Sequence, residues 1–541
     1  MNKNRSILLR LLSLLICIMI GIIVGQYMVY RKSAINKYIP IPVRYSSAEL
    51  SKLQLVFDLI KDNYVDNVNI DTLVEKTIPI VMEELDPHSV YIPASDMEQA
   101  NEYIEGNFDG IGVMFNMPND TVIVINVIGG GPSERAGVQA GDRILTVNDS
   151  LIAGQKINQN NIVKMLRGKT GTNVTVGIQR VNEPNLIHIP ITRGKIPVKS
   201  VDAAYMYNDH TGYIKLSKFS KTSHTEFLQA VLQLQKNNMQ NLIFDLRGNT
   251  GGLLDQAFEI ANEFLQKGNL IVYTEGKARQ RQDFHANGHG HLQDVDVAIL
   301  TDESTASASE IVAGALQDND RGQIIGRRTF GKGLVQEPIN FSDKSGIRLT
   351  VARYYTPTGR CIQKPYGNGK DYEDDIYQRY LHGEFTESNN IQQDTMQRFT
   401  TAGGKIVYGG GGIVPDVFVP IDTIGVNSYF EKVSRKNLIY RFAIQFSDQH
   451  RGKINTLHTL PALLDFFRHF DFPKLFTEYT TQQGIKPTVQ ELKTCQPLID
   501  NYLKAFIGRN TPLDDDGFYP FLGNIDNTLQ QAEKELGKNK R

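Results

Sequence analysis

The chain has little cysteine, no tryptophan and no excess of either charge. Of the three cysteines among its 541 residues, Cys17 lies in an apolar leader, so Cys361 and Cys495 remain, far apart in the sequence. This excludes a disulfide framework. With 58 Lys and Arg against 59 Asp and Glu, nothing in the charge favours a nucleic-acid partner. The absence of tryptophan is uninformative about function.

The most informative segments are Ser304–Leu316 and Thr329–Gln336, which place a serine before an apolar helix and a lysine in a glycine-flanked turn. A serine hydroxyl becomes an effective nucleophile when a base takes its proton. A lysine can be that base only when burial lowers its pKa. The sequence neighbours of Lys332 are apolar residues and glycines, which suit a dry pocket. The two segments predict a serine–lysine dyad of Ser307 and Lys332.

Each segment also has an ordinary structural interpretation. Ser307 and Glu310 have the spacing of a helix capping box, and Thr-Phe-Gly-Lys-Gly alone is typical of a tight turn with a solvated lysine. A cap and a nucleophile are compatible, because a helix N-terminus presents N–H groups where an oxyanion forms. The occurrence of both segments in one chain favours the catalytic interpretation.

The run STASASEIVAGALQD, followed by GRRTFGKGLVQ, resembles the C-terminal-processing, or tail-specific, serine peptidases. The resemblance implies that Ser307 is the nucleophile, that Lys332 is the general base and that Gln336 positions the lysine. It also implies an α/β fold, with a crotonase-like (Clp-peptidase/crotonase-type) β/α peptidase core, an inserted PDZ domain and flanking helical segments. It covers roughly residues 47–420, and the last hundred or so residues lie outside it.

A glycine-rich loop follows the buried strand expected at 241–246. Glycines after a strand let N–H groups approach a ligand closely, which suits an oxyanion hole, although this pattern alone is also typical of an ordinary strand-to-helix turn. We expect Asp245 and Arg247 to brace the loop rather than to react. The resemblance implies that the oxyanion donors are the amide of the residue after the nucleophile and one of two loop glycines: Ala308, with Gly251 or Gly252.

Residues 107–181 follow the succession of strands and short helices of a PDZ domain. Such domains hold the free carboxylate of a peptide in the backbone N–H groups of a loop. Arg167 stands where family members use an arginine to couple the bound tail to the active site, and an ordinary surface arginine is the alternative. The predicted carboxylate loop consists of four consecutive residues: Gly110, Ile111, Gly112 and Val113.

The remaining segments predict the domain organisation. Helical periodicity from Ser47 to Leu85 ends at an Asp-Pro turn, and we interpret His88 as part of that turn rather than as a catalytic base. Residues 366–401 are polar and predict an inserted loop or flap. We expect five parts: an N-terminal anchor or signal (1–30), a helical region (45–95), the PDZ domain (104–183), the serine peptidase core (196–425) and a C-terminal helical region of unknown role (426–541).

The histidines at 285, 289 and 291 have a spacing that suits zinc, but no nearby cysteine or carboxylate completes a rigid set. We therefore predict no metal and no cofactor.

The apolar stretch from Leu11 to Val24 follows basic residues, extends weakly to Tyr30 and lacks a small-x-small cleavage site. It is just long enough to cross a bilayer. We expect it to anchor the chain in the inner membrane of a bacterial cell envelope, with the catalytic part in the periplasm or outside. A cleaved signal, giving a periplasmic form, is the alternative.

The sequence thus predicts a serine endopeptidase that selects protein or peptide substrates by their free C-terminal tails. A catalytically inactive PDZ scaffold on a peptidase-like core, or a ligand-binding relative, is the alternative. Loss of Ser307 or Lys332 would favour it, and neither is lost. Whether the chain forms a homo-oligomer or uses an adaptor protein stays open.

Overall fold

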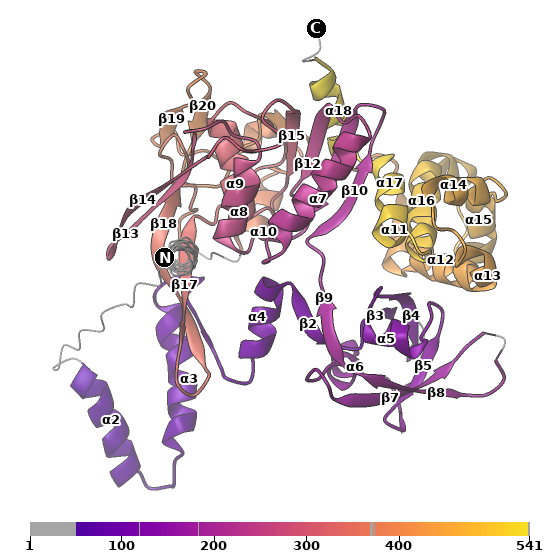
Figure 1. Ribbon diagram of the computed structural model, residues 1–541, viewed down its shortest axis with the longest axis horizontal. Helices are drawn as coiled ribbons and strands as arrows, with labels where there is room; N and C mark the ends of the chain where they lie inside the picture. The colour runs from indigo at the N-terminus through magenta and orange to yellow at the C-terminus, as the bar shows by residue number, and fades with distance from the viewer. Residues whose placement is uncertain (1–49, 118–119, 182, 368–371, 373, 539–541) are drawn as a thin grey trace, which may run out of the picture. The chain divides into compact units, whose positions relative to one another are not determined.

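The computed structural model describes residues 50–117, 120–181, 183–367, 372 and 374–538 (Figure 1). It divides into two compact units, one ending at Thr77 and the other beginning at Ile78. The segment predicted as helical contains two helices, α2 (Leu50–Asn63) and α3 (Ile70–Glu83), which are separated by a short break. The anchor predicted at residues 1–30 lies outside the described residues. Within the described ranges, no helix combines the length and the apolar character needed to cross a bilayer.

The second unit is built on a six-stranded sheet in the order β10-β11-β12-β15-β16-β21. Strand β10 runs antiparallel to β11, and the other neighbours pair in parallel. The strands are β10 (Val201–Met206), β11 (Thr211–Leu216), β12 (Asn241–Asp245), β15 (Asp296–Thr301), β16 (Gln323–Gly326) and β21 (Val417–Phe418).

Both faces of this sheet are buried, as is usual for parallel strands. Phe244 packs into the core formed with α7 (Ser223–Lys236), α8 (Leu254–Asn262) and α9 (Ala308–Asp318). Its neighbour Ile243 points to the opposite face, because side chains alternate along a strand. There α18 (Asn527–Lys538), the last helix labelled in Figure 1, contributes Leu529, Ala532 and Leu536 to the core. The end of the chain therefore completes the core of this sheet.

A second, antiparallel sheet has the order β1-β18-β13-β14, and β17 also pairs with β18. The strands are β1 (Val90–Ile92), β13 (Leu270–Gly276), β14 (Arg279–His285), β17 (Leu334–Asn340) and β18 (Gly346–Tyr355). Strand β17 begins just after Lys332 and carries Gln336, so this sheet supplies part of the candidate site.

In the described part of the segment predicted as a polar loop or flap, 366–401, there is more regular structure than the composition suggests. It contains α10 (Asp375–Leu381), η2 (Ser388–Asn390) and β19 (Arg398–Thr400), which pairs with β20 (Ile406–Tyr408). Arg379 and Glu384 are 5% and 3% exposed. Arg379 donates to the main-chain oxygens of Arg328 (2.7 Å) and Thr329 (3.1 Å). Its described part therefore braces the turn that leads to Lys332, a contact that polarity alone did not reveal.

The predicted PDZ region folds around an antiparallel sheet in the order β3-β4-β5-β7-β8, with β6 on β5. A separate pair, β2 (Asn107–Gly110) with β9 (Gly194–Pro197), lies where the chain enters and leaves this region. The other elements are α4 (Met97–Glu105), β3 (Val113–Asn116), β4 (Val122–Val127), α5 (Pro132–Ala136), β5 (Arg143–Val147), β6 (Ser150–Leu151), α6 (Gln159–Leu166), β7 (Asn173–Gln179) and β8 (Ile187–Thr192).

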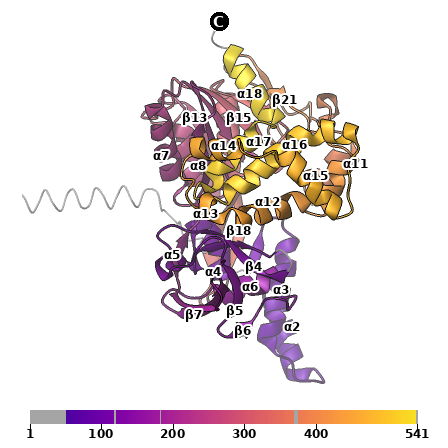
Figure 2. The ribbon, with the colours of Figure 1, turned by 90° about the vertical axis from the view of Figure 1, so that its right-hand side faces the viewer.

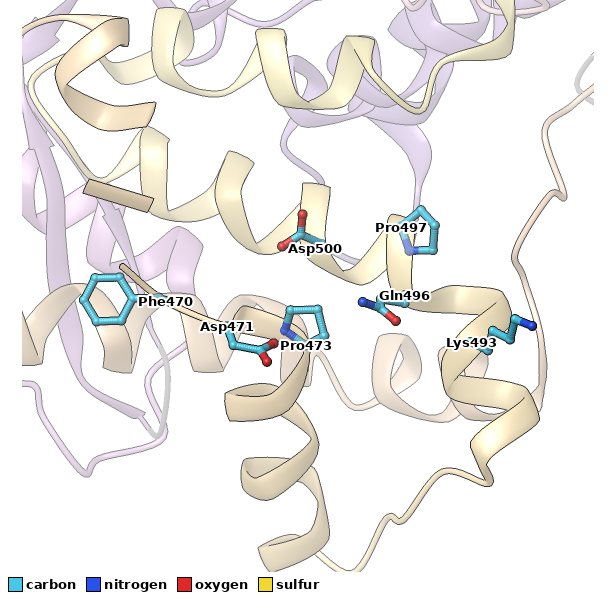
Figure 3. A pocket seen from close by; sticks show the side chains of 7 residues that line it. All are labelled: Phe470, Asp471, Pro473, Lys493, Gln496, Pro497 and Asp500. Atoms are coloured by element: carbon cyan, nitrogen blue, oxygen red, sulfur yellow. The ribbon is translucent and has the colours of Figure 1, made fainter. Parts of the chain in front are cut away.

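Helices α11 to α17 form a bundle (Figure 2). Its core is rich in aromatic side chains, which include Phe442, Phe446 and Phe476. A pocket of about 480 Å³ lies in the bundle, lined by residues of α15 and α16 and the turn before α15 (Figure 3), and contains none of the predicted site residues. The elements are α11 (Ser428–Arg435), α12 (Leu438–Gln449), α13 (Arg451–Ile454), α14 (Leu460–Phe467), α15 (Phe472–Gln482), α16 (Val489–Arg509), η3 (Asp514–Gly517) and α17 (Tyr519–Gly523).

Candidate active site

Three loops meet at one edge of the parallel sheet because β12, β15 and β16 are adjacent and run in the same direction. Strand β12 leads into the glycine-rich loop, β15 leads to Ser307, and β16 leads to Lys332. The carboxyl ends of parallel strands are where ligands usually bind in α/β sheets. The topology therefore gathers three segments that the sequence separates.

Ser307 stands immediately before α9 in an unusual backbone conformation, with φ 56° and ψ −116°. Non-glycine residues rarely adopt positive φ, and such strain persists only where the surroundings enforce it. Here the N–H of Ser307 donates to Glu310 Oε2 (2.8 Å), as the capping-box spacing predicts. The serine is thus held at the N-terminus of an entirely buried helix.

Glu310 also holds the turn that carries the lysine. Its Oε2 accepts from the N–H of Lys332 (2.9 Å), and its Oε1 accepts from the N–H of Gly331 (2.8 Å) and from Thr329 Oγ1. Burial raises the pKa of Glu310 to about 7, although these hydrogen bonds oppose the rise. One buried carboxylate therefore fixes the main chains of Ser307 and Lys332 together. The sequence identified Glu310 as a cap, and no spacing signal indicated its second contact.

A second bridge comes from Tyr354 on β18. Its Oη lies within hydrogen-bond distance of the main-chain oxygens of Lys332 (2.5 Å) and Ser307 (3.1 Å). The hydroxyl has one proton, so the shorter contact is the better hydrogen bond. No motif in the sequence pointed to this residue.

The side chain of Lys332 contacts Gln336, the residue that the resemblance implies would position it. Lys332 Nζ donates to Gln336 Oε1 (3.0 Å), and Gln336 Nε2 donates to the main-chain oxygen of His88. His88 Nε2 in turn contacts Tyr372 Oη at 2.8 Å. Between the described side chains, no hydrogen bond joins Lys332 Nζ to Ser307 Oγ. The Asp-Pro-His turn, kept out of the chemistry on sequence grounds, enters the site through its backbone.

Several groups set the electrostatics around Lys332. Burial lowers its pKa below the usual value, the positive charge of Arg348 lowers it further, and Asp86 and Glu310 oppose the shift. Burial and the charge of Lys332 also lower the pKa of His88 to about 4. The sequence neighbours of Lys332 are uncharged, as expected, but segments far along the chain bring charges to it.

The glycine-rich loop lies directly against Ser307. A Cβ on Gly251 would lie 2.8 Å from Ser307 Cβ and 2.9 Å from Ala308 N, so a side chain has no room there. The N–H of Gly251 already donates to Asn249 Oδ1 (2.9 Å). Within the described part of the chain, neither the N–H of Gly252 nor that of Ala308 has a hydrogen-bond acceptor. Of the two candidate glycines, Gly252 is therefore the one whose N–H is not already engaged by a described acceptor.

The predicted carboxylate loop belongs to a different sheet. Gly110 ends β2, Gly112 has φ +78°, and Val113 begins β3. The oxygens of Ile111 and Gly112 accept from the N–H groups of Ser133 (2.9 Å) and Ile128 (3.0 Å), which fixes the loop at the head of β3.

Arg167 follows α6 and approaches this loop, because a Cβ on Gly110 would lie 3.8 Å from Arg167 Cγ. Its Nη1 pairs with Glu102 Oε2 on α4 (2.5 Å), and its guanidinium lies over the ring of Phe108. Arg167 is therefore engaged with the segment just before the PDZ sheet rather than simply solvated.

The histidine cluster is not assembled into one site. His291 Nδ1 contacts Glu263 Oε2 and His224 Nε2 contacts Glu263 Oε1, each at 2.8 Å. Within the described residues no group of three or more His, Cys, Asp or Glu side chains could hold a metal ion.

The sequence matches four family profiles: peptidase family S41 at residues 210–374, a PDZ domain at 110–191, the N-terminal domain of the activating protease CtpB at 29–96, and a family of unknown function at 429–511. These matches confirm the predicted combination of a mixed α/β peptidase core with a PDZ domain.

A CtpA-like serine protease of Staphylococcus epidermidis is 35% identical over 350 residues, or 64% of this chain and 67% of that protein. A CtpA-like serine protease of Staphylococcus aureus is 34% identical over 365 residues, or 66% of this chain and 71% of that protein. The solved structure of the photosystem II D1 C-terminal processing protease has 24% identity and a TM-score of 0.35, covering 70% of this chain and 95% of its own.

Proposed function

Because this chain belongs to peptidase family S41, as a serine C-terminal-processing protease with a PDZ domain, we propose that it is an endopeptidase using Ser307 as nucleophile and Lys332 as general base. The observation that carries the proposal is the shared carboxylate of Glu310, which accepts hydrogen bonds from the N–H groups of both residues.

In the proposed reaction, neutral Lys332 takes the proton of Ser307 Oγ as the oxygen attacks the scissile carbonyl. The N–H groups of Ala308 and Gly252 donate to the oxyanion that forms. The lysine, now charged, gives its proton to the leaving amine, and an ester to Ser307 remains. A water molecule then attacks that ester with Lys332 again as the base, which breaks the bond to Ser307 Oγ, releases the acid product and returns the proton to Ser307.

Gln336 holds Lys332 Nζ in the structure described here. The lysine must turn from Gln336 towards Ser307 for the first proton transfer. Catalytic hydrogen bonds often tighten only when substrate is bound, and a lysine stem has enough rotatable bonds for this movement.

The first test replaces the two reacting groups. We expect Ser307→Ala to abolish hydrolysis of a peptide substrate, and Lys332→Arg to do nearly the same, because an arginine does not lose its proton in a protein. Lys344→Arg, at an exposed lysine in the turn between β17 and β18, is the matched control and should keep the wild-type rate. Substantial turnover by purified Lys332→Arg protein would remove the mechanism.

We propose further that the PDZ domain selects substrates by a free, apolar C-terminus. A fixed loop at Gly110–Val113 that leads into β3 is the arrangement by which such domains bind a carboxylate and add the tail as a strand. A tail held there raises the effective concentration of the substrate at Ser307.

Amidating the C-terminus of the peptide should therefore greatly lower kcat/KM, since it removes the charge and one oxygen that the loop recognises. Deleting residues 107–181 should cause a similar fall for the acid peptide. Equal cleavage of acid and amide peptides by the intact protein would rule out selection by the tail.

We also propose that the leader within residues 1–30 directs the catalytic part outside the bacterial cytoplasm, either as an anchor or as a cleaved signal. Membrane fractionation and the N-terminal sequence of the mature protein separate the two forms. Recovery of the full-length chain in the cytoplasm alone would contradict both.

A further inference from the structure

The C-terminal segment reaches the glycine-rich loop through a salt bridge between Asp526 and Arg247. Arg247 Nη1 and Nη2 donate to the two oxygens of Asp526 at 3.0 and 2.6 Å, while Nε and Nη2 donate to Asp245 at 3.0 and 2.7 Å. A guanidinium paired on two edges by carboxylates is held in both position and orientation. The two residues are 279 positions apart, and no sequence pattern linked them.

Asp526 is itself firmly placed. Its Oδ1 accepts from the N–H groups of Thr528 and Leu529, both at 3.0 Å, and so caps the start of α18. That helix is anchored by three apolar side chains on the sheet face opposite the main core. The carboxylate is thus a fixed point, and its hold on Arg247 is rigid.

Arg247 stands at the head of the loop that ends at Gly252. Its N–H donates to Asp245 Oδ1 (2.9 Å), and its main-chain oxygen accepts from Lys215 Nζ. Asn249, two residues on, is buried and donates from Nδ2 to the oxygen of Leu216 (2.9 Å). The main-chain oxygen of Asn249 accepts from the N–H of Ala306 (3.0 Å), the residue before Ser307. Hydrogen bonds at Arg247 and Asn249 therefore fix the course of the loop that leads to Gly252.

From this geometry we infer that Asp526 is a positioning residue for the oxyanion hole, acting through Arg247 on the loop that ends at Gly252. The C-terminal region then contributes to catalysis by supporting the oxyanion hole. The inference rests on the proposed function, because it requires an oxyanion at Gly252 and Ala308.

The test variant is Asp526→Asn. Asparagine is as good a helix cap as aspartate, so α18 keeps its acceptor for Thr528 and Leu529. The new amide faces Arg247 Nη2 with a donor, however, and the charge is lost. We expect kcat for an acid-tailed peptide to fall about tenfold, less than when an oxyanion donor itself is removed. KM should stay close to the wild-type value.

Two further measurements separate positioning from general loosening. A peptide boronate that forms a tetrahedral adduct with Ser307 should lose affinity in parallel with kcat. Binding of the uncleaved peptide to Ser307→Ala protein should be the same with and without Asp526→Asn. The control is Glu533→Ala on the same helix, which removes the contact with Asn208 (2.7 Å) and leaves Arg247 intact. It should keep kcat within about twofold of wild type.

A double variant keeps the test decisive if Asp526→Asn lowers stability. Combined with Arg247→Lys, Asp526→Asn should cause little additional loss of kcat, because both act through one contact. The inference would be overturned if Asp526→Asn kept the wild-type kcat and boronate affinity. It would also be overturned if Glu533→Ala lost as much kcat as Asp526→Asn, or if the losses of kcat in the double variant were additive. Full activity of Ser307→Ala would instead overturn the proposed function, so the two failures are distinguishable.

Discussion

At the scale of single residues, the protonation of Lys332 should control the rate. Burial lowers the pKa of the ammonium group, and Arg348 adds to the effect. In the proposed mechanism the neutral form is the base, so activity should rise with pH and level off below the pKa of a free lysine, about 10.4. The pH profile of kcat/KM measures this directly.

Arg348→Gln removes the neighbouring positive charge and should move that profile to higher pH. Arg353→Gln, at an exposed arginine on the same strand, is the control and should leave the profile in place. A profile in Arg348→Gln that is unchanged or moves to lower pH would contradict the assignment of the titrating group to Lys332.

At the scale of elements, Glu310 joins the start of α9 to the turn before β17. Glu310→Gln keeps the shape of the side chain but turns an amide donor towards groups that also donate. Leaving buried donors unpaired costs about 1–3 kcal/mol, so we expect that loss in urea unfolding, together with a lower kcat. The matched control is Glu491→Gln, because Glu491 has the same place in the exposed capping box of α16 that Glu310 has in that of α9. Its effect should stay below about 1 kcal/mol.

These elements also mark how far the sequence can be interpreted. Local periodicity is enough to predict some elements, because the apolar pattern of a buried strand or an amphipathic helix lies in consecutive residues. Examples are β4, β7, β12, α6 and α7. Ser307 and Lys332 were predicted as site residues from two short sequence motifs, and Gln336 from the family resemblance that these motifs carry. The contacts of Glu310, Tyr354 and His88 with them were not, because they depend on which strands are neighbours. The salt bridge of Asp526 belongs to the same class.

At the scale of the whole chain, the C-terminal bundle contacts both the PDZ sheet and the peptidase core. Asp448 on α12 pairs with Arg143 on β5 at 2.6 Å and with Arg451 at 3.0 Å. Tyr519 Oη of α17 donates to Asp202 on β10 at 3.2 Å. The bundle therefore ties the region proposed to bind the substrate tail to the sheet whose strand β15 leads to Ser307.

If the bundle sets how the PDZ domain presents its tail, loosening one contact should change substrate capture more than chemistry. Asp448→Asn weakens a partly exposed ion pair, and such pairs contribute about 0.2–1 kcal/mol. We expect KM for an acid-tailed peptide to change up to about fivefold, with kcat for an amidated peptide unchanged. The control is Glu431→Gln, which removes a solvent-exposed ion pair with Arg435 on α11. It should alter neither KM nor kcat. Equal effects of Asp448→Asn on acid and amide peptides would mean that the contact serves stability alone.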